Sequence, residues 1–150
     1  MRCGALVTWL AVAAAACGGE QAGQATRAAG DLAELTVRVA TGKASYMAGE
    51  SIGLTLGVRN PTDVPVTLRF ATGQRYDFVI ESAAGAAVWR WSADRAFTQG
   101  LREQIVPPGW ELDYNETFVG RLAPGTYRVR GIVTSVGDTL EARTEVVVRQ

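Results

Sequence analysis

Histidine and cysteine, two residues that many enzymes use for acid–base and nucleophilic chemistry, are absent from most of this sequence. The 150-residue chain contains no histidine, which is the commonest general base and the commonest metal ligand. Its two cysteines, Cys3 and Cys17, both lie within the first 17 residues, so no cysteine cluster can hold zinc in the rest of the chain. No serine has a histidine to activate it. The composition therefore argues against an enzyme and predicts neither a cofactor nor a metal ion.

Two local groups of polar residues are the remaining candidates for chemistry. Lys43 is the only lysine and lies two residues from Ser45, as in a serine–lysine dyad, but a solvated hairpin lysine is the simpler interpretation. Glu111, Asp113 and Glu116 form the densest carboxylate group, which suits either a calcium site or an acid–base pair. Strand spacing puts Glu111 and Asp113 on the same face, so we favour a solvated strand face instead.

The charge balance limits the kinds of partner. Lysine plus arginine is 15 and aspartate plus glutamate is 15, which gives a net charge of zero. A protein that binds nucleic acid through bulk charge would show a basic excess, so we expect no nucleic-acid partner. Hydrophobic residues make up 47% of the chain and charged residues 20%, a composition typical of a folded domain.

The first 16 residues are predicted to be an export signal. Arg2 is followed by an uncharged apolar run, Gly4 to Ala16, that is too short to span a bilayer but suits a signal-peptide core. The run ends in Ala14-Ala15-Ala16-Cys17, which looks like a bacterial lipobox, although Ala14 stands where leucine is usual. We therefore expect Cys17 to be acylated and to anchor the protein in a membrane. A plain secretory signal and a buried apolar segment are the alternatives.

A tether and one domain follow the predicted signal. Residues 17–33 are rich in glycine, alanine and glutamine, so they are predicted to form a flexible tether that reaches roughly 20–25 Å. Gly18 after the cysteine favours, by the rule for bacterial lipoproteins, the periplasmic face of the outer membrane in a cell with two membranes. Residues 34–150 are predicted to be a single folded domain.

The hydrophobic pattern of this domain predicts strands. Apolar residues alternate with polar or small ones in segments at 35–39, 52–58, 64–70, 76–80, 87–91, 112–118, 127–133 and 140–149. Turn residues such as Asn60-Pro61-Thr62-Asp63 and Pro107-Pro108-Gly109 separate them. The pattern predicts an all-β, immunoglobulin-like antiparallel β-sandwich of about eight strands. Residues 92–111 show no regular period and are predicted to form a long irregular connection.

Two further features of the domain concern its aromatic residues. Gly125-Thr126-Tyr127 resembles the tyrosine corner of immunoglobulin-like sandwiches. Strand spacing puts Trp89 and Trp91 on one face, with Phe97 and Trp110 nearby in the sequence. Core packing is the simpler interpretation for Trp89. Trp91 lies at the end of a strand, where it either packs in the core or anchors the long connection or a partner protein.

A longer pattern contains several of these aromatic residues. It runs Thr72-Gly73-Gln74-Arg75-Tyr76-Asp77-Phe78-Val79-Ile80, then Gly85, then Val88-Trp89-Arg90-Trp91-Ser92, then Phe97-Thr98-Gln99. This pattern resembles the BsuPI family of intracellular proteinase inhibitors, with Thr72 where serine is commoner. Pro108-Gly109 and Gly125-Thr126-Tyr127 match a later turn and strand start of the family.

The resemblance implies an immunoglobulin-like sandwich that inhibits a serine protease by binding to it. The candidate partner contacts are Gln74, Tyr76, Asp77, Trp89, Trp91 and Phe97. The family name refers to an intracellular inhibitor, whereas this chain is predicted to be exported, so the protease of the namesake is not the expected target. The alternative function is a structural or scaffolding lipoprotein without inhibitory activity, which predicts a polar surface with no aromatic patch.

Overall fold

Strands dominate the part of the chain that the computed structural model describes, residues 30–150. The predicted signal peptide, Cys17 and most of the predicted tether lie outside these residues. The described elements are η1 (Leu32–Glu34, a 3₁₀ turn), β1 (Thr36–Thr41), β2 (Ser45–Met47), β3 (Ile52–Arg59), β4 (Val66–Thr72), β5 (Tyr76–Ser82), β6 (Ala87–Arg90), β7 (Gln99–Val106), β8 (Glu111–Phe118), β9 (Gly125–Val133) and β10 (Leu140–Arg149).

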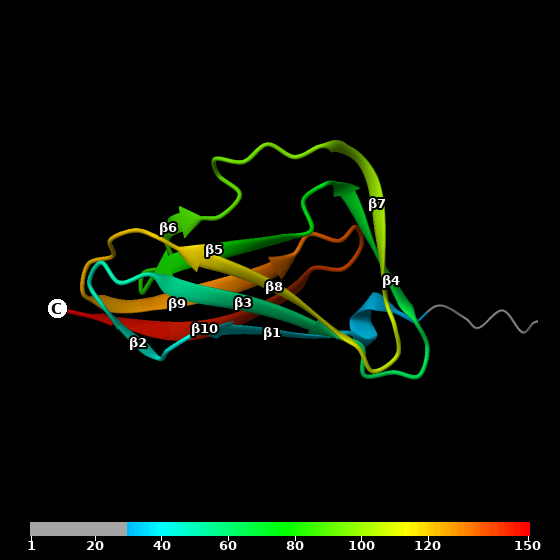
Figure 1. Ribbon diagram of the computed structural model, residues 1–150, viewed down its shortest axis with the longest axis horizontal. Helices are drawn as coiled ribbons and strands as arrows, with labels where there is room; N and C mark the ends of the chain where they lie inside the picture. The colour runs from blue at the N-terminus through cyan, green and yellow to red at the C-terminus, as the bar shows by residue number, and fades with distance from the viewer. Residues whose placement is uncertain (1–29) are drawn as a thin grey trace, which may run out of the picture.

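The strands form two facing sheets and a smaller ribbon (Figure 1). One sheet has the order β1-β3-β8 and the other the order β2-β10-β9-β5-β6. Strands β4 and β7 pair with each other at one end of the molecule. Neighbouring strands are antiparallel, except that the short β2 runs parallel to β10. The predicted all-β, immunoglobulin-like sandwich is therefore confirmed, with ten strands in residues 30–150.

One core lies between the two sheets. The alternating apolar residues of β3 are the clearest case, because Ile52, Leu54, Leu56 and Val58 are all at most 1% exposed. Phe78 and Ile80 of β5 pack in the same core. Burial of each such side chain contributes about 1.5–3 kcal/mol to folding. Strand spacing in the sequence thus identified most of the inward-facing residues correctly.

The sheets approach closely at Gly131 of β9. A Cβ atom at this position would lie 2.8 Å from Leu56 Cδ1 and 3.2 Å from Val39 Cγ2, both on the opposite sheet. A larger residue would force the Leu56 and Val39 side chains to move or the sheets to separate. Glycine at position 131 therefore permits the close approach of the two sheets here.

The predicted tyrosine corner is present. The Tyr127 hydroxyl donates a hydrogen bond to the carbonyl oxygen of Ala123, four residues upstream, at 2.9 Å. This bond fixes the turn through which the chain enters β9.

The predicted irregular connection at 92–111 was partly wrong, because it contains the whole of β7. The strand escaped prediction because its apolar residues do not alternate: Leu101 and Ile105 face outward and are 78% and 60% exposed, whereas Val106 faces inward and is buried. Pairing with β4, rather than a local hydrophobic pattern, creates this strand. Strand β2 was also missed, since its three residues are too few to show a period.

The folded domain starts before the predicted boundary at residue 34. The backbone N–H of Gly30 donates to the carbonyl oxygen of Pro65 at 3.0 Å, and Leu32 packs against the core. Asp31 and Glu34 form a capping box around η1. Residues 30–33, predicted as the end of the tether, therefore belong to the packed domain.

Candidate protein-binding site

The pattern that carries the family resemblance folds around a buried carboxylate. Asp77 lies on β5 and is only 2% exposed. Its Oδ1 accepts hydrogen bonds from the backbone N–H groups of Phe78 and Ser92, at 2.9 and 3.1 Å, and its Oδ2 accepts from the Ser92 hydroxyl at 2.7 Å. The Arg90 guanidinium lies 3.3 Å from Oδ2. Asp77 therefore fixes the end of β6 and the first residue after Trp91.

Four aromatic rings form a column beside this carboxylate, and we call Phe97, Trp91, Tyr76 and Tyr114 the aromatic column. The centroids of Trp91 and Phe97 are 5.8 Å apart, those of Trp91 and Tyr76 are 4.6 Å apart, and those of Tyr76 and Tyr114 are 4.6 Å apart. Each ring is half-buried. Since Tyr76 lies on β5 and Tyr114 on β8, the column joins the two sheets.

Two hydroxyl groups of the column donate hydrogen bonds to polar side chains. Tyr76 donates to Glu116 Oε1 at 2.6 Å, and Tyr114 donates to Gln104 Oε1 at 3.1 Å. Burial raises the pKa of the Tyr76 hydroxyl, and the hydrogen bond to the Glu116 carboxylate raises it further. Burial likewise raises the pKa of Tyr114. Both phenols therefore stay protonated at neutral pH and act as hydrogen-bond donors.

Two members of the column, Trp91 and Phe97, lie in residues 91–98, which we call the β6–β7 loop, and their rings pack beneath its exposed residues. Its start is fixed by the bonds between Asp77 and Ser92, and its end by a 2.8 Å hydrogen bond from the Gly73 N–H to the Thr98 carbonyl oxygen. The outward residues Ala93, Asp94, Arg95, Ala96 and Thr98 are exposed. Figure 1 shows the loop along one long side of the domain. The loop is thus presented to solvent in a fixed shape.

Comparison of the sequence with known protein families identifies the family of this domain. The sequence matches the BsuPI family, described as intracellular proteinase inhibitor, over residues 39–137, about two-thirds of the chain. The chain belongs to the BsuPI family. The matched range includes the whole aromatic column and the β6–β7 loop. The family description names an inhibitor of proteinases, which indicates a non-enzymatic domain.

Solved structures resemble the BsuPI domain in fold alone. The sporulation control protein Spo0M from Bacillus subtilis is 13% identical, with a TM-score of 0.51, and the match covers 78% of this chain and 50% of that chain. The CARDB domain of PF1109 from Pyrococcus furiosus is 15% identical, with a TM-score of 0.44, over 77% of this chain and 94% of that domain. The chain spans half the length of the Spo0M chain. A search of curated proteins finds no significant match.

The six candidate contacts of the BsuPI domain have different roles. Tyr76, Trp91 and Phe97 meet in the aromatic column and are half-buried, so part of each side chain faces solvent. Asp77 is buried and bonded internally, and it is therefore not available to a partner as the sequence suggested. Its role in this structure is to hold Ser92 at the start of the loop.

The other two candidates also have structural partners. Trp89 is half-buried and packs edge-on against Phe118, with centroids 5.2 Å apart, which agrees with the core interpretation. Gln74 donates from Nε2 to the Tyr76 carbonyl oxygen at 3.2 Å, and the backbone carbonyl oxygen of Gln74 accepts from the Thr134 hydroxyl at 2.8 Å. Gln74 therefore joins the β4–β5 turn to the end of β9.

Sequence reasoning missed two residues that complete the site. Arg95 places its guanidinium 4.1 Å from the centroid of the Trp91 ring, and its Nε donates to the Trp91 carbonyl oxygen at 3.1 Å. Tyr114 extends the column from the opposite sheet. For Arg95, the only local signal in the sequence was its spacing of four residues from Trp91. Tyr114 was visible only as an inward residue of a predicted strand.

The candidate groups for chemistry do not assemble. Glu111 and Asp113 lie on the outer face of β8 and pair with Arg38, at 2.5 and 3.0 Å, whereas Glu116 faces inward toward Tyr76. Lys43 pairs with the Glu50 carboxylate and not with Ser45. Within residues 30–150, no three histidine, cysteine or acidic side chains are arranged to hold a metal ion. In the same residues, no helix has the length and apolar character needed to cross a bilayer.

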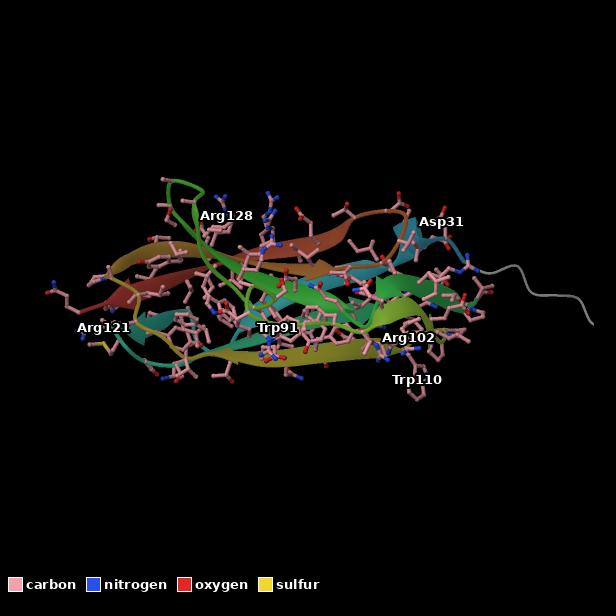
Figure 2. All side chains as sticks on the ribbon, turned by 90° about the horizontal axis from the view of Figure 1, so that it is seen from above. Asp31, Trp91, Arg102, Trp110, Arg121 and Arg128 are labelled. Carbon is pink, nitrogen blue, oxygen red and sulfur yellow. The ribbon has the colours of Figure 1, made fainter. Side chains whose placement is uncertain are left out.

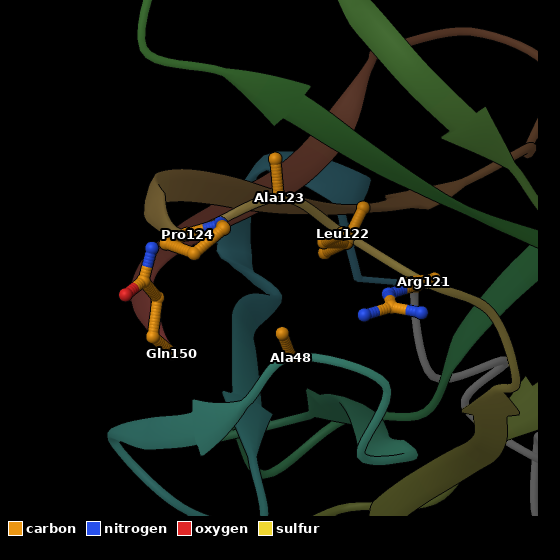
Figure 3. Close-up of a pocket in the computed structure, with 6 residues that line it drawn as sticks. All are labelled: Ala48, Arg121, Leu122, Ala123, Pro124 and Gln150. Atoms are coloured by element: carbon orange, nitrogen blue, oxygen red, sulfur yellow. The ribbon is translucent and has the colours of Figure 1, made fainter.

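A hollow lies at one end of the domain, and none of its lining residues belongs to the aromatic column. It has a volume of about 720 Å³ and is lined by Ala48, Arg121, Leu122, Ala123, Pro124 and Gln150 (Figure 3). Arg121 supplies the only charged side chain among these lining residues, so the hollow has no acid–base pair. Figure 2 places Arg121 at the opposite end of the molecule from Trp110.

Proposed function

We propose that this protein is a lipid-anchored cell-envelope inhibitor that binds a serine protease non-covalently through the β6–β7 loop. The observation that carries the proposal is the fixed shape of this exposed loop within a BsuPI domain. Bonds from Asp77 and Gly73 hold its two ends, and Trp91 and Phe97 support it from beneath. A partner that binds such a loop does not have to order it, which lowers the entropic cost of binding.

The chemistry of the loop suits contact with another protein. The half-exposed rings of Trp91 and Phe97 lie near the two ends of the loop, and the Arg95 guanidinium stacks on the Trp91 ring. Aromatic residues and arginine are enriched at the energetically important positions of protein interfaces. The net charge of the chain is zero, so the contact is expected to depend on shape and aromatic burial more than on long-range attraction.

The location of the inhibitor is proposed from the N-terminal sequence. The apolar run that ends in Ala14-Ala15-Ala16-Cys17 supports export and acylation of Cys17, with the domain on the periplasmic face of the outer membrane in a cell with two membranes. The target would then be a protease of the envelope or one that is secreted. Loss of labelling by a palmitate analogue in Cys17→Ala cells, compared with the parent, tests the anchor; unchanged labelling would contradict it.

The scaffolding alternative differs in what it predicts for the surface. It predicts no aromatic patch, whereas Tyr76, Trp91 and Phe97 are all partly accessible beside the loop. This observation supports the inhibitor over the scaffold. A structural lipoprotein would also bind no protease with its loop.

Inhibition of purified proteases tests the proposed function. Residues 17–150 carrying Cys17→Ser are titrated against a panel of secreted serine proteases, and peptide hydrolysis is measured. We expect inhibition of at least one protease at micromolar concentration, and equal binding to that protease when its catalytic serine is replaced, since the contact is non-covalent. No inhibition and no complex across the panel would contradict the proposal.

A pair of matched variants tests the role of the loop. Ala96 is exposed in the β6–β7 loop, and Ala84 is exposed in the turn between β5 and β6. Ala96→Trp should weaken inhibition at least about tenfold, which corresponds to ~1.4 kcal/mol, because the added ring obstructs the contact. Ala84→Trp adds the same ring elsewhere and should leave inhibition unchanged. Equal effects of the two would assign the contact to another surface.

A further inference from the structure

We propose that the end of the domain that carries Trp110 lies against the surface of the bilayer in which the protein is anchored. The inference rests on the lipid attachment proposed above and adds a second, non-covalent contact with the same membrane. It concerns a surface that is separate from the β6–β7 loop. Four observations support it: the exposure of Trp110, its rigid support, the place where the chain enters the domain, and the surrounding side chains.

Trp110 is the most exposed aromatic residue of the described chain. It is 63% exposed, whereas the other tryptophans in residues 30–150, Trp89 and Trp91, are half-buried. It follows Pro107-Pro108-Gly109, where the Trp110 N–H donates to the Pro107 carbonyl oxygen at 3.1 Å and Gly109 has φ +72°. Proline followed by a glycine of positive φ is typical of a type II turn. An indole exposed at a tight turn is unusual, because such a large apolar side chain gains by leaving water.

A buried asparagine holds this turn rigidly. Asn60 is 0% exposed, and its backbone N–H donates to the Trp110 carbonyl oxygen at 2.9 Å while its carbonyl oxygen accepts from the Gly109 N–H at 2.9 Å. Its side-chain amide donates to the carbonyl oxygens of Val64 and Val106, at 2.8 and 2.9 Å. The backbone of the turn that bears Trp110 is therefore fixed to the β3–β4 loop, and the indole projects from it into solvent.

The chain enters the domain at this same end. The Gly30 N–H donates to the carbonyl oxygen of Pro65, in the β3–β4 loop that Asn60 joins to Trp110. Figure 2 places Trp110 and Asp31 at the same end of the molecule, on opposite edges of the view. Only 12 residues separate Cys17 from Gly30, so even a fully extended tether reaches at most about 45 Å. A lipid at Cys17 would thus keep this end of the domain close to the bilayer.

Other exposed side chains at this end of the domain suit contact with the headgroup region of a bilayer, without a requirement for anionic lipid. Val136, which lines the same hollow as Gly30, and Ile105, just before the turn, are 54% and 60% exposed. The exposed charges of these elements are mixed: the acidic ones are Asp31, Glu34, Asp63, Glu103 and Glu111, and the basic ones are Arg59, Arg69 and Arg102. Tryptophan settles at the boundary between lipid headgroups and acyl chains, where its ring and its N–H are both accommodated. The contact therefore does not require anionic lipid.

Quenching of tryptophan fluorescence by brominated lipid tests the contact directly. The chain from residue 17 has one cysteine, Cys17, so it can be coupled chemically to a maleimide lipid in phosphatidylcholine vesicles whether or not cells acylate it. We compare vesicles with and without bromine on the upper part of the acyl chains. We expect brominated lipid to quench the coupled protein, and Trp110→Phe to lose most of this quenching. The matched control Trp89→Phe, which changes a core-packed indole, should retain it.

Each outcome decides the proposal independently of the anchor and of protease binding. No quenching of the coupled parent protein, or equal quenching in Trp110→Phe and Trp89→Phe, would overturn the bilayer contact; the first would leave a protein partner as the reason for Trp110. A requirement for anionic lipid would also overturn it, because the contact is argued from apolar burial. Failure of palmitate labelling in cells would contradict the natural anchor without changing the result with coupled protein. Circular dichroism shows whether each variant is folded.

Discussion

The carboxylate of Asp77 holds Ser92 by two hydrogen bonds, with 3.1 Å between Oδ1 and the Ser92 backbone nitrogen and 2.7 Å between Oδ2 and the Ser92 hydroxyl. The two residues are 15 apart in the sequence and lie on either side of the β5–β6 hairpin. Since Ser92 directly follows Trp91, this contact sets where the β6–β7 loop begins. The loop proposed to bind a protease is thus shaped by a residue that no partner can reach.

Replacement of Asp77 should weaken the fold and not just the loop. Asp77→Ala leaves the buried N–H of Phe78 and the groups of Ser92 without acceptors, so we expect the free energy of unfolding to fall by about 2–3 kcal/mol. Urea-induced unfolding of residues 17–150 measures the change. Asp94→Ala, at an exposed position of the loop, is the matched control and should stay within about 0.5 kcal/mol of the parent. Equal losses in the two variants would contradict the structural role of Asp77.

The sandwich could be predicted well from the sequence because the core residues of its strands alternate locally with polar or small residues. Ile52, Leu54, Leu56 and Val58 are apolar at every second position, and the structure buries all four. β7 could not be predicted in this way, because its outward face carries Leu101 and Ile105. Only pairing with β4, which joins residues about 35 positions apart such as Arg69 and Glu103, reveals the strand.

The candidate site was predictable in its residues but not in their roles. The family pattern pointed to Tyr76, Asp77 and Trp91 together, yet it could not separate a partly accessible ring from a buried carboxylate. That distinction depends on long-range contacts, such as the stacking of Tyr76 on Tyr114, 38 residues later on the facing sheet. The exposure of Trp110 depends likewise on Asn60, which holds the turn from a distant loop.

Glycine at position 131 should be required by the spacing of the sheets. A methyl group there would lie 2.8 Å from Leu56 Cδ1, so Gly131→Ala is expected to lower the free energy of unfolding by about 1–3 kcal/mol through overpacking. Gly53→Ala in β3 is the matched control, because a Cβ at Gly53 meets nothing within 4 Å. It should be neutral or slightly stabilising. Thermal unfolding of both variants checks the difference, and a Gly131→Ala protein as stable as the parent would refute it.

The tyrosines of the aromatic column should make stability fall at high pH. Burial and the bond to Glu116 raise the pKa of Tyr76 in the folded protein, whereas the unfolded chain releases the proton near pH 10. The folded state therefore binds more protons than the unfolded state above about pH 10, and the free energy of unfolding must decrease as the pH rises further. The stabilisation that follows from the raised pKa of Tyr76 is fully present below about pH 10, so the free energy of unfolding does not change for this reason near neutral pH.

Tyr76→Phe tests this dependence. The substitution removes one of the two hydroxyl groups of the column whose pKa is raised. The free energy of unfolding of the variant should therefore decline less steeply than that of the parent between pH 9 and 11, as measured by urea titration at each pH. The additional change Tyr114→Phe, which removes the second raised phenol, should flatten the decline further. At neutral pH, Tyr76→Phe should cost about 1 kcal/mol for the lost hydrogen bond to Glu116. Identical slopes in parent and variants would show that the column does not titrate as argued.

Trp91 should decide whether the β6–β7 loop keeps its shape. Its ring contacts Tyr76 on one side and carries Phe97 and the Arg95 guanidinium, so Trp91→Ala removes the support beneath the loop. We expect amide hydrogen exchange of residues 92–98 to accelerate at least about tenfold, equivalent to ~1.4 kcal/mol of local stability, with the amides of β9 less affected.

Two matched variants make the Trp91 prediction specific. Trp91→Phe keeps an aromatic ring in the column and should retain most of the protection of the loop. Trp110→Ala removes an exposed indole at the end of the domain and should leave exchange in residues 92–98 unchanged. If the loop is as protected in Trp91→Ala as in the parent, its shape does not depend on the aromatic column. The bonds that Asp77 and Gly73 make to its two ends would then suffice to fix it.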